Sequence, residues 1–266
     1  MARVVAVEAL DHLAPDDPEA MRSRRDLARV HRAMGTRSII RRGWRALVSP
    51  PRAAAPLRIL ELGAGDGTLL LGVARSLTPG WPRVQLSLLD RQDIVTPATL
   101  AGFAKLGWAA QVHVADVLTW AARPDVTSSG LPSPPSPPST SPSTSPSPSS
   151  PPPPPRWDLI TTSLFLHHFE GAQLDLLLAA VAARCDRFHA CEPGRSWLAL
   201  AGSHLVGAIG ANAVTRADAV LSVRAGFRRD EISARWPRAG VDWQLRESAA
   251  GLFSHSFSAH RSGAAQ

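Results

Sequence analysis

The feature that most constrains the fold is a short apolar run that leads directly into three alternating glycines. Ile59–Leu62 is followed by Gly63, Gly65 and Gly67, and a helical pattern begins at Thr68. Glycine has no Cβ, so the backbone can turn tightly and pass close under a ligand. A strand, a glycine turn and a helix in this order are typical of nucleotide-binding α/β proteins. From the turn alone, an ordinary tight connection between strand and helix remains the alternative.

The spacing of the glycines excludes two familiar nucleotide motifs. A dinucleotide fingerprint needs its third glycine where this chain has Thr68. A phosphate loop of the Walker type needs a Lys-Ser/Thr pair after the glycines, and none follows. The GxGxG turn is therefore neither of these.

Apolar runs of strand length alternate with helical stretches through most of the chain. We expect strands at Leu57–Leu62, Val84–Leu89, Ala110–Val114, Trp157–Thr162 and Arg187–Cys191, with helices at Thr68–Leu77, Thr99–Leu106 and Gln173–Ala183. Short buried strands between helices predict a parallel sheet covered on both faces. Two last runs, Val241–Ser248 and Leu252–His260, are separated only by a short turn, which allows a hairpin and no crossover helix. The predicted fold class is α/β, a Rossmann-like parallel sheet that ends in an antiparallel hairpin.

Two carboxylates follow the second and third predicted strands. Asp90 ends the second strand, and Asp116 comes just after the third, before Val117. The carboxyl ends of parallel strands share one edge of the sheet, which places Asp90 to accept ribose hydroxyls. At the same edge, Asp116 can accept an adenine amino group while Val117 packs on the ring. A single aspartate of this kind is more often a turn or helix cap, but two in succession after GxGxG are a more specific signal.

Together these segments resemble the motifs of class I S-adenosylmethionine (SAM) dependent methyltransferases, especially bacterial small-molecule enzymes of quinone and polyketide type. The resemblance covers Leu57 through Pro193 and the terminal hairpin. It implies that Glu61 helps to hold the methionine end of SAM, and that the seventh strand is inserted antiparallel near the sheet edge. The predicted cofactor-binding residues are Glu61, Gly63, Ala64, Gly65, Gly67, Asp90, Arg91, Asp116, Val117 and Ser163.

A histidine pair follows the fourth predicted strand, where an open α/β sheet places its reacting groups. The segment Thr161–Phe169 contains His167 and His168, and it lacks the motifs of enzymes that methylate base amines or pyrimidine carbon. The pair resembles the Leu-His-His pattern of quinone and natural-product methyltransferases. Either histidine is a candidate general base for a phenol, enol or activated carbon, with His167 narrowly favoured. Capping or packing of the following helix is the competing interpretation.

Three segments lie outside the motifs. Pro18–Trp44 has apolar residues at helical spacing, and the resemblance makes residues 1–56 a helical lid over a methyltransferase domain of residues 57–266. An interfacial basic helix and an RNA-binding arm are the competing interpretations of Pro18–Trp44. Trp197–Phe227 is a mainly apolar insert that favours a lipophilic or aromatic acceptor, and plain helix packing would give the same pattern. Thr127–Pro155 consists almost entirely of Pro, Ser, Thr and Gly, so we expect a disordered loop insertion.

Charge and cysteine usage limit the other function classes. The net charge of +7 suggests nucleic acid, but the basic excess is concentrated in nine arginines between Arg22 and Arg45. An RNA methyltransferase is therefore the second hypothesis, and a non-catalytic SAM-binding module is the third. Cys185 and Cys191 show no metal-ligand spacing, and we expect two buried thiols and no metal. The chain shows no membrane-length apolar run and no secretory leader, which favours a cytoplasmic protein.

Overall fold

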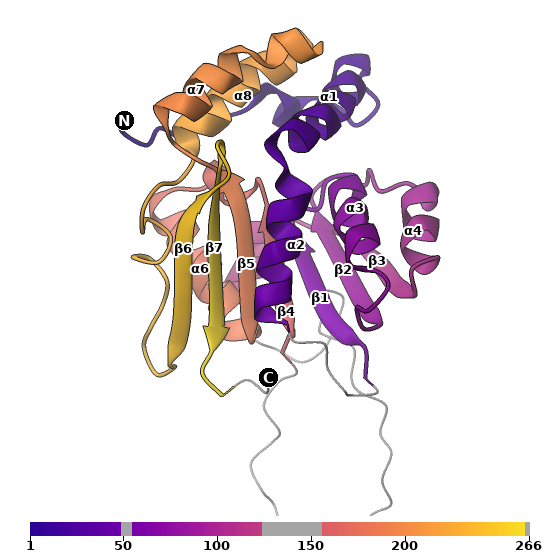
Figure 1. Cartoon of the computed structure of the whole chain (residues 1–266), viewed down its shortest axis with the longest axis vertical. Helices are drawn as coiled ribbons and strands as arrows, with labels where there is room; N and C mark the ends of the chain where they lie inside the picture. Colours follow the sequence, from indigo (N-terminus) through magenta and orange to yellow (C-terminus); the bar gives the residue numbers. More distant parts are fainter. Residues whose placement is uncertain (49–54, 124–155, 264–266) are drawn as a thin grey trace, which may run out of the picture.

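A seven-stranded sheet forms the centre of the protein (Figure 1). The computed structural model describes residues 1–48, 55–123 and 156–263. The strands are β1 (Leu57–Leu62), β2 (Val84–Asp90), β3 (Trp108–Val114), β4 (Leu159–Ser163), β5 (Arg187–Pro193), β6 (Trp243–Ala250) and β7 (Ser254–Arg261). Their order is β3-β2-β1-β4-β5-β7-β6, with β1 to β5 parallel and β7 antiparallel to both neighbours. The predicted parallel sheet with a terminal hairpin is confirmed.

Helices cover both faces of this sheet. They are α1 (Pro18–Met34), α2 (Thr36–Leu47), α3 (Thr68–Leu77), α4 (Pro97–Ala104), α5 (Val117–Ala122), α6 (Gly171–Arg184), α7 (Trp197–His204) and α8 (Ala213–Ala225), with 3-10 turns η1 (Ala9–His12), η2 (Leu166–His168) and η3 (Val206–Ile209). Apolar residues of α2, α3 and α4 form one buried cluster with the sheet, and those of α5 and α6 form the other. Buried strands explain why their sequences read as continuous apolar runs rather than alternating ones.

The N-terminal helical segment divides into two helices with different positions. Gly35, at φ 67°, ends α1 and starts α2. Helix α2 packs into the core, because Ile40 and Trp44 are fully buried and the Trp44 ring stacks on Trp108 with centroids 6.3 Å apart. Helix α1 lies with α7 and α8 beyond the carboxyl ends of the parallel strands (Figure 1). The lid role stays a prediction, and it concerns α1.

One asparagine joins α1 to the start of α8. The Asn212 backbone N–H donates to the buried Asp26 carboxylate at 2.7 Å, and the Ser23 hydroxyl lies 3.0 Å from Asn212 Oδ1. Asn212 Oδ1 also caps α8 by accepting from the Thr215 backbone N–H at 2.8 Å. These bonds join α1 to the amino end of α8.

The predicted insertion Thr127–Pro155 lies outside the described residues. The described residues on either side of it, Arg123 and Arg156, both contact the last turn of α6. The Arg123 carbonyl accepts from Arg184, and Arg156 donates to the Ala182 carbonyl at 3.0 Å. Arg156 precedes the amino end of β4, which is the end of that strand away from the histidine pair.

None of the helices in the described residues is long and apolar enough to cross a membrane.

Candidate functional site

The glycine turn has the backbone geometry that only glycine adopts without strain. Gly63, Gly65 and Gly67 have φ values of 70°, 55° and 72°. A Cβ on Gly65 would have no heavy atom within 4 Å, so this part of the turn faces open space. A Cβ on Gly63 would collide with the Phe165 ring at 2.2 Å. Ala64 lies between them and packs at the edge of the α2–α3 core.

Asp90 holds this turn from the end of β2. Its Oδ2 accepts from the Gly65 backbone N–H at 2.8 Å, and its Oδ1 accepts from the Gln92 backbone N–H at 2.9 Å. Each carboxylate oxygen retains a second lone pair, so the group can still accept hydroxyl donors. The structure therefore brings Asp90 next to the glycine turn, as the spacing predicted.

Glu61 presents a buried polar atom at the same edge. The residue is 2% exposed, and its Oε2 has no hydrogen-bond partner among the described residues. Burial raises the pKa of its carboxyl well above the ordinary value, the adjacent Ser163 hydroxyl opposes this rise, and Asp90 and Asp66 add to it. A buried carboxyl oxygen without a partner carries a desolvation cost that a bound ammonium or hydroxyl donor would remove.

Three other predicted cofactor residues have structural contacts of their own. Asp116 caps α5 by accepting from the Thr119 backbone N–H at 2.8 Å. Helix capping was the alternative to adenine binding in the sequence analysis. Val117 is 5% exposed and belongs to the α5–α6 core. Arg91 turns toward the N-terminal segment, where its guanidinium lies 3.3 Å from Asp11 Oδ1.

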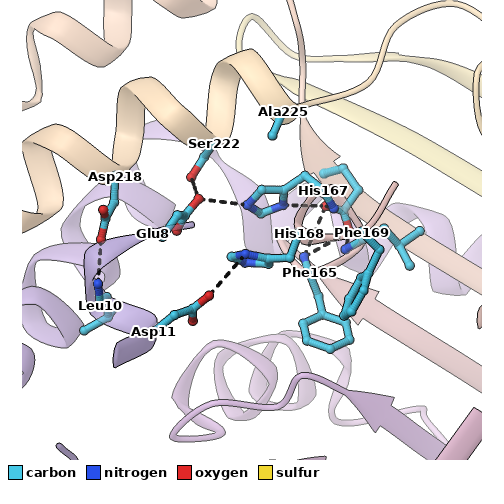
Figure 2. Close-up of polar contacts among 12 residues, drawn as sticks. Glu8, Leu10, Asp11, Phe165, His167, His168, Phe169, Asp218, Ser222 and Ala225 are labelled. Carbon is cyan, nitrogen blue, oxygen red and sulfur yellow. Dashed lines mark hydrogen bonds and ion pairs between the residues drawn. The ribbon is translucent and has the colours of Figure 1, made fainter. Parts of the chain in front are cut away.

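The histidine pair lies in the 3-10 turn η2, directly after β4 (Figure 2). His167 is enclosed between two carboxylates. Its Nδ1 lies 2.9 Å from Glu192 Oε2, and its Nε2 lies 3.3 Å from Glu8 Oε1. Figure 2 shows Glu8 reaching His167 from the N-terminal segment, with Ser222 of α8 bonded to the same carboxylate.

Glu192, in β5, is fully buried and organises the whole turn. Its two oxygens accept backbone N–H groups from Phe165, Leu166 and His167 at 3.0 to 3.3 Å. Because an anionic acceptor faces Nδ1, the His167 proton is held on that nitrogen, and Nε2 becomes the atom available for proton exchange. Sequence reasoning assigned no functional role to Glu192, which directly follows the predicted strand Arg187–Cys191.

The electrostatics bear on His167 as a candidate base. A histidine with an unperturbed pKa of about 6.5 would be mainly neutral at physiological pH, but the pKa of His167 is not unperturbed. Burial lowers the pKa of His167, yet its hydrogen bonds to Glu192 and Glu8 and their charges outweigh this and raise it to about 9. With Glu192 and Glu8 both in place, His167 is therefore mainly an imidazolium at neutral pH.

His168 has the opposite character. Burial and the neighbouring charge of His167 lower the pKa of His168, although Glu8 and Asp11 oppose this. Its Nδ1 lies 3.4 Å from Asp11 Oδ2, and the two histidine rings are 4.2 Å apart. His168 is therefore neutral at pH 7 and in contact with the N-terminal segment.

We predict that Glu8→Gln lowers the pKa of His167 below about 9 without unfolding the protein. The change removes one of two anionic neighbours and keeps the shape of the side chain. An NMR titration of the imidazole resonances measures the shift, with Glu19→Gln, an exposed change in α1, as the control. An unchanged pKa would show that Glu8 does not hold this proton.

Glu8, His167 and His168 also have ligand atoms within 4.8 Å of one another, close enough for a metal ion. Both ring nitrogens of His167 already face carboxylates, and its raised pKa favours a proton there. Within this group Glu8 and His167 are hydrogen-bonded to each other, and His168 pairs with Asp11.

Comparisons with solved structures identify the architecture. The plantazolicin methyltransferase BpumL, solved with a triazolic desmethylplantazolicin analogue and S-adenosylhomocysteine (SAH), aligns with a TM-score of 0.55 at 12% identity, covering 92% of both chains. The pyocyanin biosynthetic protein PhzM aligns with 0.51 at 16% identity, over 93% of this chain and 60% of its own. An O-methyltransferase family protein from Burkholderia thailandensis aligns with 0.50 at 11% identity, over 94% and 62%.

The chain has the class I methyltransferase fold. No protein-family model matches the sequence. No curated protein matches it either. At these identities the likeness shows the fold alone.

Within this methyltransferase fold, the residues that sequence reasoning missed come from distant parts of the chain. Glu8 and Asp11 contact the histidine pair from the N-terminal segment, and Arg3 donates to the carbonyls of His167 and Phe169 at 3.2 and 2.8 Å. Glu192 had one available signal, because a carboxylate next to the buried run Phe188–Cys191 needs partners.

Proposed function

We propose that the protein is a SAM-dependent methyltransferase that acts on a small acceptor with an ionisable hydroxyl or enol group. The observation that carries this proposal is the unpartnered buried oxygen of Glu61 beside the open Gly65 and the carboxylate of Asp90. The carboxyl oxygens of Glu61 and Asp90 are hydrogen-bond acceptors for the ammonium and the ribose hydroxyls of SAM. Solved neighbours that contain SAH support the same cofactor.

The chain supplies placement rather than activation of the methyl group. SAM, when bound, provides a methyl group already activated on a sulfonium. Glu61 and Ser163 would hold the amino acid end, the backbone of Gly63–Gly67 would pass under it, and Asp90 would orient the ribose. Orientation of this kind is worth up to about 7 to 11 kcal/mol in well-aligned systems.

His167 is the proposed proton acceptor. In this role the acceptor hydroxyl replaces Glu8 at Nε2, and Glu192 continues to hold the proton on Nδ1. Loss of the Glu8 contact lowers the pKa of His167 from about 9, which shifts the imidazole toward its neutral, basic form when the acceptor arrives. His168, which is already neutral, remains the second candidate.

A lipophilic or aromatic acceptor fits the apolar composition of Trp197–Phe227. Helix α8 of that insert packs against η2, so the insert borders the histidine pair. Whether the methyl group goes to oxygen or carbon depends on the acceptor.

We predict that Asp90→Ala weakens SAH binding by roughly 10- to 10²-fold, since a hydrogen bond to a charged group contributes about 1.5 to 3 kcal/mol. Calorimetry measures the affinity. Asp175→Ala, in an exposed ion pair on α6, is the matched control and should bind normally. Saturable binding of NADH without any of SAH would instead indicate an oxidoreductase.

Two alternatives are tested separately. An RNA methyltransferase would bind RNA with a steep salt dependence in a filter assay. A non-catalytic module would bind SAH but give no methylated product when incubated with SAM and host metabolite extract. Mass spectrometry of that mixture distinguishes this module from an enzyme.

A further inference from the structure

The helix and 3-10 turn after β5 expose an unusual amount of apolar surface. Between Ser196 and Thr215 the chain contains no Asp, Glu, Lys or Arg. Trp197 is 74% exposed and Leu205 is 67% exposed, and Leu198 and Ile209 are also exposed. Isolated apolar side chains are common on protein surfaces, but several on one short segment indicate a contact surface.

The β6–β7 turn adds to this surface. Leu252, at the turn, is 67% exposed. The adjoining Phe253 packs on α7, because a Cβ on Gly202 would lie 2.9 Å from its ring. We call Trp197, Leu198, Leu205, Ile209 and Leu252 the apolar cap.

Arginines of α1 lie beside the apolar cap. Arg22, Arg25 and Arg29 line a hollow of about 420 Å³ together with Gly210 and Asn212, and Gly210 directly follows Ile209. The Arg29 guanidinium donates to the Gly210 carbonyl at 3.2 Å. Asp26, the acid in this hollow, is 4% exposed and is bonded to Arg29 and Asn212, so its charge is largely withdrawn from solvent.

The two features form one surface of fixed shape. Asn212 ties α1 to η3 and α8 through Ser23 and Asp26, and α7 packs along α8. In Figure 1 these helices form the layer at the top of the molecule, beyond the carboxyl ends of β1 to β5. An apolar patch with an exposed tryptophan and flanking arginines matches a surface that is apolar inside and anionic at its boundary.

We infer that the apolar cap and the α1 arginines dock the protein on an anionic lipid bilayer. Trp197, Leu205 and Leu252 enter the boundary between headgroups and acyl chains, and Arg22 and Arg25 contact the lipid phosphates. The flanking arginines favour an anionic lipid surface as the partner, because their charges complement its phosphate headgroups. This inference does not depend on the proposed methyl transfer.

Sedimentation with vesicles tests it on the full chain. We expect binding to vesicles of equimolar phosphatidylcholine and phosphatidylglycerol, weaker binding to phosphatidylcholine alone, and partial release by salt. Trp197→Ser with Leu205→Ser should lower the partition coefficient by roughly tenfold or more, because two large apolar side chains no longer enter the bilayer. Arg22→Gln with Arg25→Gln should remove the preference for the anionic vesicles.

Control variants distinguish a loss of membrane docking from unfolding and from a general effect of removing an exposed charge or apolar side chain. Leu176→Ser on α6 and Arg75→Gln on α3 change exposed residues of the same types elsewhere and should bind like the parent chain. Thermal unfolding must show each variant folded, and SAH binding should be equal in all of them. Equal sedimentation of the parent chain and the cap variant overturns the inference. So does a dimer, formed without vesicles, that is lost in the cap variant.

Discussion

His167→Gln is expected to lower turnover by roughly 10² to 10⁴, the usual contribution of a positioned general base. The reason is its geometry, because Glu192 fixes Nδ1 as the donor and leaves Nε2 for the acceptor proton. Glutamine has similar size but no basic nitrogen. SAH affinity should stay unchanged, since His167 does not contact the glycine turn. Single-turnover rates per folded molecule measure the effect.

His168→Gln is the matched control for this experiment. It changes the adjacent residue of the same type, so a small effect there assigns the proton transfer to His167. A large effect in His168→Gln alone would move the role to His168, whose pKa is lowered. Full activity in both variants would leave catalysis to placement alone.

Glu192→Ala should cost about 3 to 5 kcal/mol in the free energy of unfolding at pH 7, the penalty for breaking a buried charged pair. The change leaves the His167 imidazolium and the N–H groups of Phe165 and Leu166 without their acceptor. Urea unfolding measures the loss. Glu170→Ala is the control, because Glu170 is exposed and its side chain makes no cap hydrogen bond to α6.

The same variant has a defined pH signature. His167 has a folded pKa of about 9 and an unfolded pKa of about 6.5, so its protonation stabilises the fold by roughly 3 kcal/mol. That stability is fully present below about pH 6.5 and is lost as the pH rises through about 9. In Glu192→Ala this loss between pH 6.5 and 9 should shrink. An equal slope in both proteins would contradict the assigned pair.

The sequence predicts the central part of the fold well because local and global signals agree there. The bounds of Leu57–Leu62 and Thr68–Leu77 match β1 and α3, since a buried strand, a glycine turn and a helix each have a local pattern. The inserted position of β7 came only from the family resemblance. No pattern in a single sequence says between which strands a hairpin lies.

Only those residues of the candidate site that stand at the carboxyl ends of strands could be brought together from the sequence. Asp90 and the glycines fall at such ends, so topology alone places them together. Glu8 and His167 are separated by 159 positions, and their contact depends on how an irregular N-terminal segment crosses the sheet edge. The pKa of His167 depends on that contact and on burial, and neither has a periodic signature in the sequence.

The positions of Arg123 and Arg156 have a practical consequence for protein engineering. Both residues contact the last turn of α6, and β4 runs from there toward the histidine pair. A fluorescent or affinity module inserted between them would therefore be joined to the fold at the end of β4 away from the histidine pair. Such a fusion would leave the N-terminal segment and the apolar cap unmodified. Experiments on either one should therefore carry their reporter between Arg123 and Arg156.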